Sequence, residues 1–393
     1  MRIRNFKSTY LFLFLGLNFQ LISCAQQPHQ IKTGASQIAL YLPDIQYKKI
    51  AVVANQTSVL FSKNGIQIHL VDTLLTQGVD VVKVFAPEHG FRGKADAGEE
   101  IVDGIDAKTQ LPIISLYGAN KKPSAKQLAG IELVVFDIQD VGVRFYTYIS
   151  TLHYVLEACA ELNIPVLLLD RPNPNGHYID GPVLEKAHQS FVGMHPVPVV
   201  YGMTIGEYGN MINGEGWLQN GLQCELTVVP LKNYTHQTTY ALPVKPSPNL
   251  PNSKAIHLYP SLCFFEGTTV SVGRGTEQQF QIYGAPFFKK TDFSFVPMPN
   301  EGAKYPKHKG ERCFGENLAT TKRLENIDLQ WLLKAYRQKT TAPFFNAFFT
   351  KLAGTKKLQD QIEKGLSEAA IRTSWQAALH RFQKIRTQYL LYK

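Results

Sequence analysis

Short apolar runs alternate with helical segments between residues 49 and 169, and this alternation limits the fold more than any other feature of the chain. Strands that are apolar along their whole length are typical of a parallel sheet covered by helices on both faces. The sequence therefore predicts an α/β fold with a Rossmann-like parallel sheet. The predicted strands are residues 49–54, 79–85, 112–117, 131–136 and 164–169, and the predicted helices are residues 66–75, 126–129 and 146–162.

The composition changes after about residue 205. Residues 240–253 contain four prolines, which predicts an extended, rigid connection that could close one end of a pocket. Helical spacing follows in 327–336, 343–352 and 367–389, with Pro343 suited to a first helical position. We therefore expect a second α/β subdomain. The expected segments are a signal peptide (1–23), a tether (24–45), a Rossmann-like subdomain (46–205) and a C-terminal α/β subdomain (206–393).

The first residues are typical of an export signal. A basic start, MRIR, precedes the apolar run Tyr10–Phe19, and the segment ends in LISC, which resembles a bacterial lipobox. The apolar run is too short to span a bilayer as a helix. We expect lipid attachment at Cys24 and a protein anchored to a bacterial membrane, facing the periplasm or the cell surface. An ordinary signal peptide with an incidental cysteine is the alternative.

Charge and cysteine content narrow the class of protein only slightly. The formal net charge is +10, of which three charges lie in the first 23 residues. A basic balance favours anionic polymers such as nucleic acid or cell-wall glycans, although a solvated basic surface explains it equally well. The other four cysteines match no metal or redox motif, so we expect buried thiols, with one disulfide as the alternative. No G-x-G-x-x-G or Walker motif indicates a nucleotide cofactor.

The stretch FAPEHGFRG, residues 85–93, is the strongest candidate for chemistry. Pro87 and Gly90 predict a tight turn that presents Glu88 and His89 at the end of a buried strand, where ligands bind in open α/β sheets. A carboxylic acid in a partly apolar cleft can act as a general acid. The alternatives are that Glu88 caps the next helix or pairs with Arg92.

Other acids follow neighbouring strands and should share the same edge of the sheet. Asp137 and Asp140 follow residues 131–136, and Asp170 follows residues 164–169, so we expect them around one cleft with Glu88. An ion pair between Asp140 and Arg144 is the structural alternative for that pair. These acids with His89 could also ligate a divalent metal, but no metal-binding spacing supports such a site.

Two loops have the composition of binding loops. Asp170 and Asn173 lie in DRPNPNG, which suits a sugar or an amide, unless an Asp170–Arg171 pair only stabilises the turn. Arg274 lies between two glycines in GRGTE and suits a substrate carboxylate, unless it pairs with Glu277 or Glu266. Tyrosines 146, 148 and 283 could stack on a sugar ring or belong to the core.

Several of these motifs together resemble the NamZ (YbbC-like) family of exo-β-N-acetylmuramidases. The resemblance extends from about residue 45 to the end of the chain. The motifs that carry it are FAPEHGFRG, DIQDVGVRFYTY, LDRPNPNG, EGTTVSVGRGTEQQFQIYGAP and a C-terminal SWQ…F…IR..YLLY.

This resemblance implies a Rossmann-like subdomain, a C-terminal α/β subdomain and an active-site cleft between them. It also implies release of N-acetylmuramic acid from the non-reducing ends of cell-wall fragments, without a metal or cofactor and without nucleic acid as a partner. We expect a cation for the lactyl carboxylate of that sugar, with Arg274, Arg144 or Arg92 as candidates. The candidate catalytic residues are Glu88, His89, Asp137 and Asp140; the candidate substrate-binding residues are Arg92, Arg144, Tyr146, Asp170, Asn173, Arg274, Thr276 and Glu277.

Glycoside hydrolysis usually needs two carboxyl groups, and Glu88 is the candidate for the general acid. The second group could be Asp137, Asp140, Asp170, Glu266 or Glu277, or the 2-acetamido group of the substrate. Two other functions fit the sequence. One is a glycan-binding lipoprotein without catalysis, and the other is a metal-dependent hydrolase or amidase.

Overall fold

The computed structural model describes residues 30–62, 64–92, 103–340 and 342–392. The chain divides into two units, residues 1–30 and 31–393, and every element below belongs to the second unit. Cys24 and the predicted signal peptide lie outside the described residues. Within the described residues, no helix is both long enough and apolar enough to cross a membrane.

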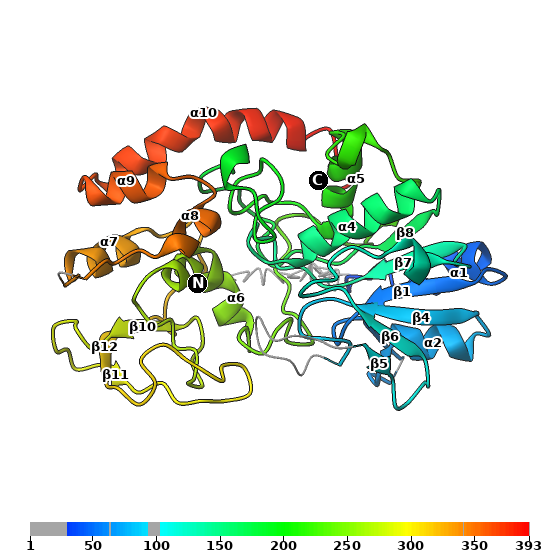
Figure 1. Cartoon of the computed structure of the whole chain (residues 1–393), viewed down its shortest axis with the longest axis horizontal. Helices are drawn as coiled ribbons and strands as arrows, with labels where there is room; N and C mark the ends of the chain where they lie inside the picture. Colours follow the sequence, from blue (N-terminus) through cyan, green and yellow to red (C-terminus); the bar gives the residue numbers. More distant parts are fainter. Residues whose placement is uncertain (1–29, 63, 93–102, 341, 393) are drawn as a thin grey trace, which may run out of the picture. The chain divides into compact units, whose positions relative to one another are not determined.

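A seven-stranded sheet forms one side of the second unit, on the right of Figure 1. All neighbouring strands are parallel except the short β5, which pairs antiparallel with β6. This confirms the predicted parallel sheet. Its order is β5 (Gly104–Ile105), β6 (Pro112–Ser115), β4 (Val81–Ala86), β1 (Ile50–Ala54), β7 (Leu133–Asp137), β8 (Val166–Leu169) and β9 (Leu226–Val229).

Helices cover both faces of this sheet, whose central strands β1, β7 and β8 are buried at every position. On one face, residues 50, 52 and 54 of β1 pack in a core with α1 (Ile38–Ile45) and α2 (Leu70–Thr76). Ala51 and Val53 belong to the opposite core with α3 (Ala125–Leu128), α4 (Tyr148–Glu161) and α5 (Ile205–Gly214). The last part of the predicted tether is thus folded, since Tyr41 and Ile45 of α1 are fully buried.

The remaining elements form the smaller sheet and the helices on the left of Figure 1. The sheet is antiparallel, in the order β10 (Ile282–Ala285), β12 (Cys313–Asn317) and β11 (Ser294–Phe295). The chain is therefore α/β in both parts, as predicted. The helices are α6 (Ser253–Leu262), α7 (Gln330–Arg337), α8 (Ala347–Ala353), α9 (Lys357–Glu363) and α10 (Glu368–Arg386), and the short 3₁₀ turns are η1 (Lys186–His188), η2 (Gln219–Gly221) and η3 (Cys263–Gly267).

The C-terminal helix connects the two parts. Figure 1 shows α10 extending from α9 back toward α5. At its end, Arg386 donates to the carbonyl of Gly202, and the Tyr392 hydroxyl donates to Asp170 Oδ2 over 2.6 Å. The predicted boundary at residue 205 stays a prediction, although β9, which follows it, belongs to the large sheet.

Two predicted helices begin in the wrong place. Residues 66–75 were expected to be helical, but Gln67–His69 is strand β3, which pairs with β2 (Val59–Phe61). Helix α2 begins only after His69, whose Nδ1 accepts from the Val71 amide. The helix expected from Pro343 begins at Ala347, because Asn346 supplies its N-cap.

All four cysteines among the described residues are free and buried, at positions 159, 224, 263 and 313. Burial raises the pKa of the Cys159 thiol well above its usual range. They therefore behave as the small buried hydrophobes that the sequence predicted.

Candidate active site

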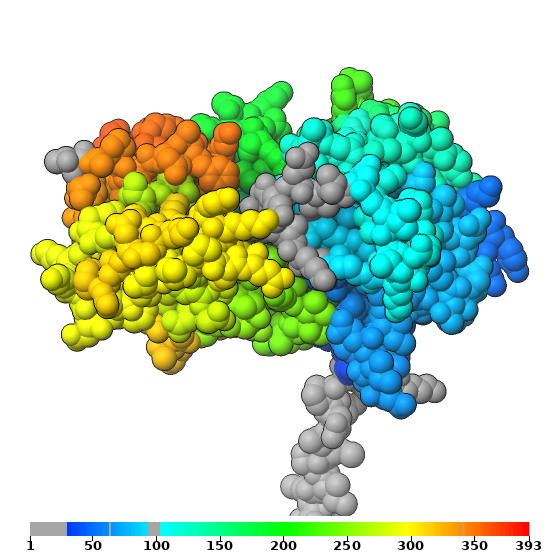
Figure 2. Space-filling model, turned by 60° about the horizontal axis from the view of Figure 1, so that its bottom comes forward, coloured from blue at the N-terminus to red at the C-terminus, as the bar shows by residue number. Residues whose placement is uncertain are grey.

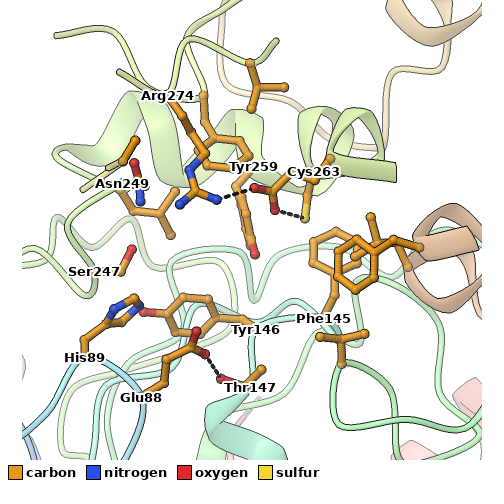
Figure 3. A pocket seen from close by; sticks show the side chains of 18 of the residues that line it. Glu88, His89, Phe145, Tyr146, Thr147, Ser247, Asn249, Tyr259, Cys263 and Arg274 are labelled. Atoms are coloured by element: carbon orange, nitrogen blue, oxygen red, sulfur yellow. Dashed lines mark hydrogen bonds and ion pairs between the residues drawn. The ribbon is translucent and has the colours of Figure 1, made fainter. Parts of the chain in front are cut away.

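A cavity of about 690 Å³ lies at the carboxyl ends of the large sheet. Residues 88–192 of the sheet-bearing part form one wall, and residues 247–352 form the other. Figure 3 shows Glu88 and His89 on one side of this cavity and Arg274 on the opposite side. The polar residues that line it are Glu88, His89, Tyr117, Lys121, Tyr146, Thr147, Tyr148, Ser247, Asn249, Tyr259, Cys263, Glu266, Ser271, Arg274, Tyr305 and Lys307.

Glu88 lies on the β-turn that the sequence predicted. Strand β4 ends at Ala86, and the Gly90 amide then donates to the Pro87 carbonyl over 3.0 Å. His89 adopts a φ of 73°, a left-handed conformation that costs energy for a residue with a Cβ. This turn places the Glu88 side chain in the cavity rather than along the strand (Figure 3).

Three residues hold Glu88 in place from neighbouring elements. The hydroxyl of Thr147, immediately before α4, donates to Glu88 Oε2 over 2.7 Å. Tyr117, which follows β6, forms a side-chain hydrogen bond with Glu88; burial and the nearby carboxylate raise the pKa of this tyrosine above its usual range. The Tyr148 hydroxyl lies 3.4 Å from the Glu88 carbonyl oxygen. The carboxyl group is therefore oriented before any ligand binds.

The opposite wall carries a paired carboxylate and guanidinium. Turn η3 presents Glu266, whose Oε1 accepts from Arg274 Nη1 over 2.8 Å. The Cys263 thiol lies 3.6 Å from the other carboxylate oxygen of Glu266. The structure thus contains the Glu266–Arg274 pair that the sequence left open, yet Arg274 still lines the cavity.

Lys307 adds a second, partly buried positive charge to this wall. Its ammonium group donates to the carbonyls of Phe265, Glu266 and Thr268 over 2.9, 3.1 and 2.6 Å. Burial lowers its pKa to about 8, against the opposing effect of Glu266. Arg274 and Lys307 thus place two cationic groups beside the Glu266 carboxylate at this end of the cavity.

The proline-rich segment forms part of the cavity wall. The hydroxyls of Tyr146 and Tyr148 donate to the carbonyl of Pro246 over 2.9 and 3.2 Å. Ser247 and Asn249, which follow, line the cavity. This segment therefore joins the two walls, and its suggested role in closing one end of the pocket stays a prediction.

Comparison with known proteins matches both parts of the chain. Residues 50–254 match the family model described as exo-beta-N-acetylmuramidase NamZ, N-terminal, and residues 257–392 match the corresponding C-terminal model. The chain belongs to the NamZ family. It is 36% identical over 403 aligned positions to the peptidoglycan beta-N-acetylmuramidase NamZ of Bacillus subtilis (strain 168), with 94% of this chain and 92% of that protein covered. It is therefore a glycoside hydrolase.

Two solved structures of DUF1343 family proteins from Bacteroides fragilis NCTC 9343 share the fold of this NamZ family member. One is 44% identical with a TM-score of 0.85, covering 93% of this chain and 99% of its own. The other is 26% identical with a TM-score of 0.78, covering 92% and 99%. Both similarities extend across the two parts of the chain, which confirms the predicted α/β architecture.

Among the acids predicted to share the cleft with Glu88, Asp137 lies elsewhere in this NamZ family member. It is fully buried and pairs with Arg171, at 2.6 Å from Oδ1 to Nε and 2.8 Å from Oδ2 to Nη2. The predicted position at the cleft is therefore wrong. Both oxygens of the Asp137 carboxylate accept from the Arg171 guanidinium, so this acid binds the residue that follows Asp170 and does not line the cavity.

Asp140 and Asp170 are also buried away from the cavity. Asp140 accepts hydrogen bonds from the Tyr201 hydroxyl and the Gly142 amide, and burial raises its pKa to about 6. Asp170 accepts from the Thr204 and Tyr392 hydroxyls over 2.7 and 2.6 Å. The donors to both acids come from residues that cover the strand ends, and neither acid lines the cavity.

Two of the three predicted cations have structural partners instead of a place in the cavity. Arg144 is fully buried, and its guanidinium donates only to backbone carbonyls. The Asp140–Arg144 pair therefore does not form either. Arg92 pairs with Asp106 over 2.7 Å, so it is not the partner of Glu88 that the sequence allowed.

Among the other predicted binding residues, one lines the cavity and three do not. Tyr146 lines the cavity. Asn173 is buried and donates to the Met203 carbonyl, and Gly142 lies so close to it that a Cβ would be 2.2 Å from Asn173 Oδ1. Thr276 caps its own loop by donating to the Gly273 carbonyl, and Glu277 is exposed outside the cavity.

Sequence analysis missed Thr147, Tyr117 and Lys307. Thr147 directly follows Tyr146 in the DIQDVGVRFYTY motif, and Tyr117 ends a predicted strand, so their positions carried a usable signal. Lys307 carries none, since it lies in an irregular loop that the fold brings back to η3. In the described part of the chain, no three His, Cys, Asp or Glu side chains are grouped as metal ligands.

Proposed function

We propose that this protein is an exo-acting glycosidase that releases N-acetylmuramic acid from the non-reducing end of peptidoglycan fragments, with Glu88 as the general acid/base. The observation that carries this proposal is the geometry of Glu88, an oriented carboxyl group facing a cavity with a cationic opposite wall. The peptidoglycan muramidase of Bacillus subtilis supports the substrate class.

Glu88 protonates the glycosidic oxygen as the bond to the departing sugar breaks. Thr147 and Tyr117 donate to its carboxyl group and fix its orientation, so little reorganisation is needed in the transition state. After departure of the leaving group, a water molecule bonds to the anomeric carbon and gives its proton to the Glu88 carboxylate, which restores the acid. A general acid of this kind contributes about 10²- to 10⁴-fold to the rate.

The cationic wall recognises the lactyl carboxylate of N-acetylmuramic acid. Arg274 presents a planar guanidinium, which suits a carboxylate, and Lys307 adds charge from behind it. Glu266 neutralises part of this charge and holds the arginine in one orientation. A neutral N-acetylglucosamine unit lacks the group that this wall binds, so the site favours the muramic acid end of a fragment.

Substitution of Glu88 tests the proposal. The purified protein is incubated with the disaccharide N-acetylmuramic acid–N-acetylglucosamine, and release of free N-acetylmuramic acid is followed by mass spectrometry. Glu88→Gln keeps the shape of the side chain but cannot transfer the proton, so we expect kcat to fall by about 10²- to 10⁴-fold. KM should change much less, because the amide still fills the same space.

Glu161→Gln is the matched control, since Glu161 is a partly exposed glutamate paired with Lys122 outside the cavity. It should retain full activity. Wild-type turnover by Glu88→Gln would overturn the role of Glu88. Tight binding of the disaccharide by the wild-type protein without any sugar released would favour a glycan-binding protein and overturn the proposed activity.

We further propose that Cys24 carries a lipid and anchors the protein to a bacterial membrane. The order of basic start, apolar run and LISC supports this. Incorporation of labelled fatty acid into the protein, lost in Cys24→Ala, is the expected result. Equal labelling of both proteins would contradict it.

A further inference from the structure

Tyr305 is an aromatic residue that lines the cavity and is nevertheless 92% exposed. Phe348 of α8 also lines the cavity and is 37% exposed. Residues near 300, yellow in Figure 2, lie on the same face as residues near 120, cyan, and both segments contribute to the cavity walls. Tyr305 and Phe348 are more exposed than Glu88 and Lys307, which also line the cavity, so the two aromatic side chains lie nearer its mouth.

The backbone around Tyr305 is held firmly although its side chain is exposed. Before it, the Gly302 carbonyl accepts from the amide of Asn249 and from Arg274 Nη2. After it, the Lys307 ammonium group donates to the carbonyl oxygens of Phe265 in η3 and of Thr268, which follows η3. An aromatic ring on a fixed segment offers contact area with little conformational entropy to lose on binding.

We propose that Tyr305 is a sugar-stacking residue of a leaving-side subsite, which binds the amino sugar that follows the cleaved bond. The inference rests on the proposed exo activity. In that geometry the terminal sugar occupies the enclosed part of the cavity, between Glu88 and Arg274. The rest of the glycan must leave through the mouth, past Tyr305.

The chemistry of the ligand matches the exposed ring. One face of a pyranose ring is formed by C–H groups, while its hydroxyl and acetamido groups project from the edge. A tyrosine ring has an apolar face and a polar tip, so it can pack against the C–H face while its edge stays hydrated. At 92% exposure, the Tyr305 ring is accessible to such a ligand.

Two substrates that differ only after the cleaved bond test this subsite. The first is the methyl β-glycoside of N-acetylmuramic acid, whose leaving group is too small to reach Tyr305. The second is a tetrasaccharide that begins with N-acetylmuramic acid at its non-reducing end. For Tyr305→Ala we expect kcat/KM on the tetrasaccharide to fall about ten-fold through KM. On the methyl glycoside it should not change.

Tyr47→Ala is the matched control, because Tyr47 is 90% exposed and lies outside the cavity. It should leave both substrates unaffected, and Tyr305→Phe should keep tetrasaccharide activity, since stacking needs the ring and not the hydroxyl. Equal loss on both substrates, or no loss on the tetrasaccharide, would overturn the subsite. If Tyr305→Phe lost as much tetrasaccharide activity as Tyr305→Ala, the stacking role of the ring would be overturned. If the wild-type protein cleaves neither substrate, the proposed function fails and this inference fails with it.

Discussion

Replacing Arg144 by methionine should destabilise the protein without weakening substrate binding. Its guanidinium has no acidic partner and donates instead to four buried carbonyls, two from each part of the chain. Nη1 donates to Pro182 and Val197, both at 2.7 Å, and Nη2 donates to Leu352 and Ala353 at 2.9 and 2.8 Å. Leu352 and Ala353 end α8, so Arg144 supplies donors that the helix itself lacks at that end.

The expected loss follows from these four contacts. Each buried carbonyl left without a donor costs about 1–3 kcal/mol, and removing the buried charge returns part of that cost. We therefore expect the free energy of unfolding to fall by about 4 kcal/mol, the lower end of that cost taken over the four carbonyls. Residues 31–393 form one unit, whose unfolding entropy is about 0.8 kcal/mol/K, so Tm should fall by about 5 °C.

Thermal unfolding and steady-state kinetics on the same preparations provide the assay. Arg92→Met is the matched control: its ion pair with Asp106 is partly exposed and should contribute less than about 1 kcal/mol. Folded Arg144→Met should keep the wild-type KM, because the side chain does not reach the cavity. An unchanged Tm together with a ten-fold higher KM would refute this reasoning and restore Arg144 as a substrate-binding residue.

Two further substitutions distinguish a residue that stabilises the fold, Asp137, from a residue that lines the cavity, Lys307. Asp137→Asn removes the charge that pairs with buried Arg171, so urea unfolding should show a loss of about 3–5 kcal/mol while folded protein keeps its kcat; a selective loss of kcat would make Asp137 catalytic. Lys307, whose pKa burial lowers to about 8, is protonated below that pH and neutral above it. The wild-type KM should therefore rise as pH increases through about 8, and Lys307→Met should show a high KM with no such rise; a wild-type KM that is flat across this range would contradict the proposed anion site.

Most of the large sheet could be predicted because each strand is continuously apolar and ends in a polar or glycine-containing cluster. Strands β1, β4, β7 and β8 lie within or close to the ranges predicted from that pattern, and they pair in parallel. The point at which the helix after β3 begins was harder to predict. The apolar spacing from Ile66 onward fits a helix, yet pairing with β2 keeps Gln67–His69 extended. A single sequence does not show whether a segment will form a helix or pair with a neighbouring strand in a hairpin.

The candidate site could be predicted only where the turn itself fixed the side chain. Glu88 follows a buried strand within a four-residue turn, which the sequence predicted, whereas Thr147 and Tyr117, which orient its carboxyl group, come from other elements. Arg274 was also found, because its flanking glycines indicated a close approach of the backbone. Glu266 was named as a possible partner of Arg274, but Lys307 lies near them only because the loop around residue 305 folds onto η3, and that contact leaves no local pattern.

The misplaced acids show why strand ends contain more polar residues than the chemistry needs. A parallel sheet ends in loops that must pack over one another, and their backbone amides and hydroxyls need buried acceptors. Asp137 takes the Arg171 guanidinium, and Asp170 takes the hydroxyls of Thr204 and Tyr392. These carboxylates fix the loops that surround the cavity, whereas the carboxyl group of Glu88 faces the cavity itself. An acid after a strand is therefore a candidate for catalysis only when its carboxyl group faces the cavity, as that of Glu88 does.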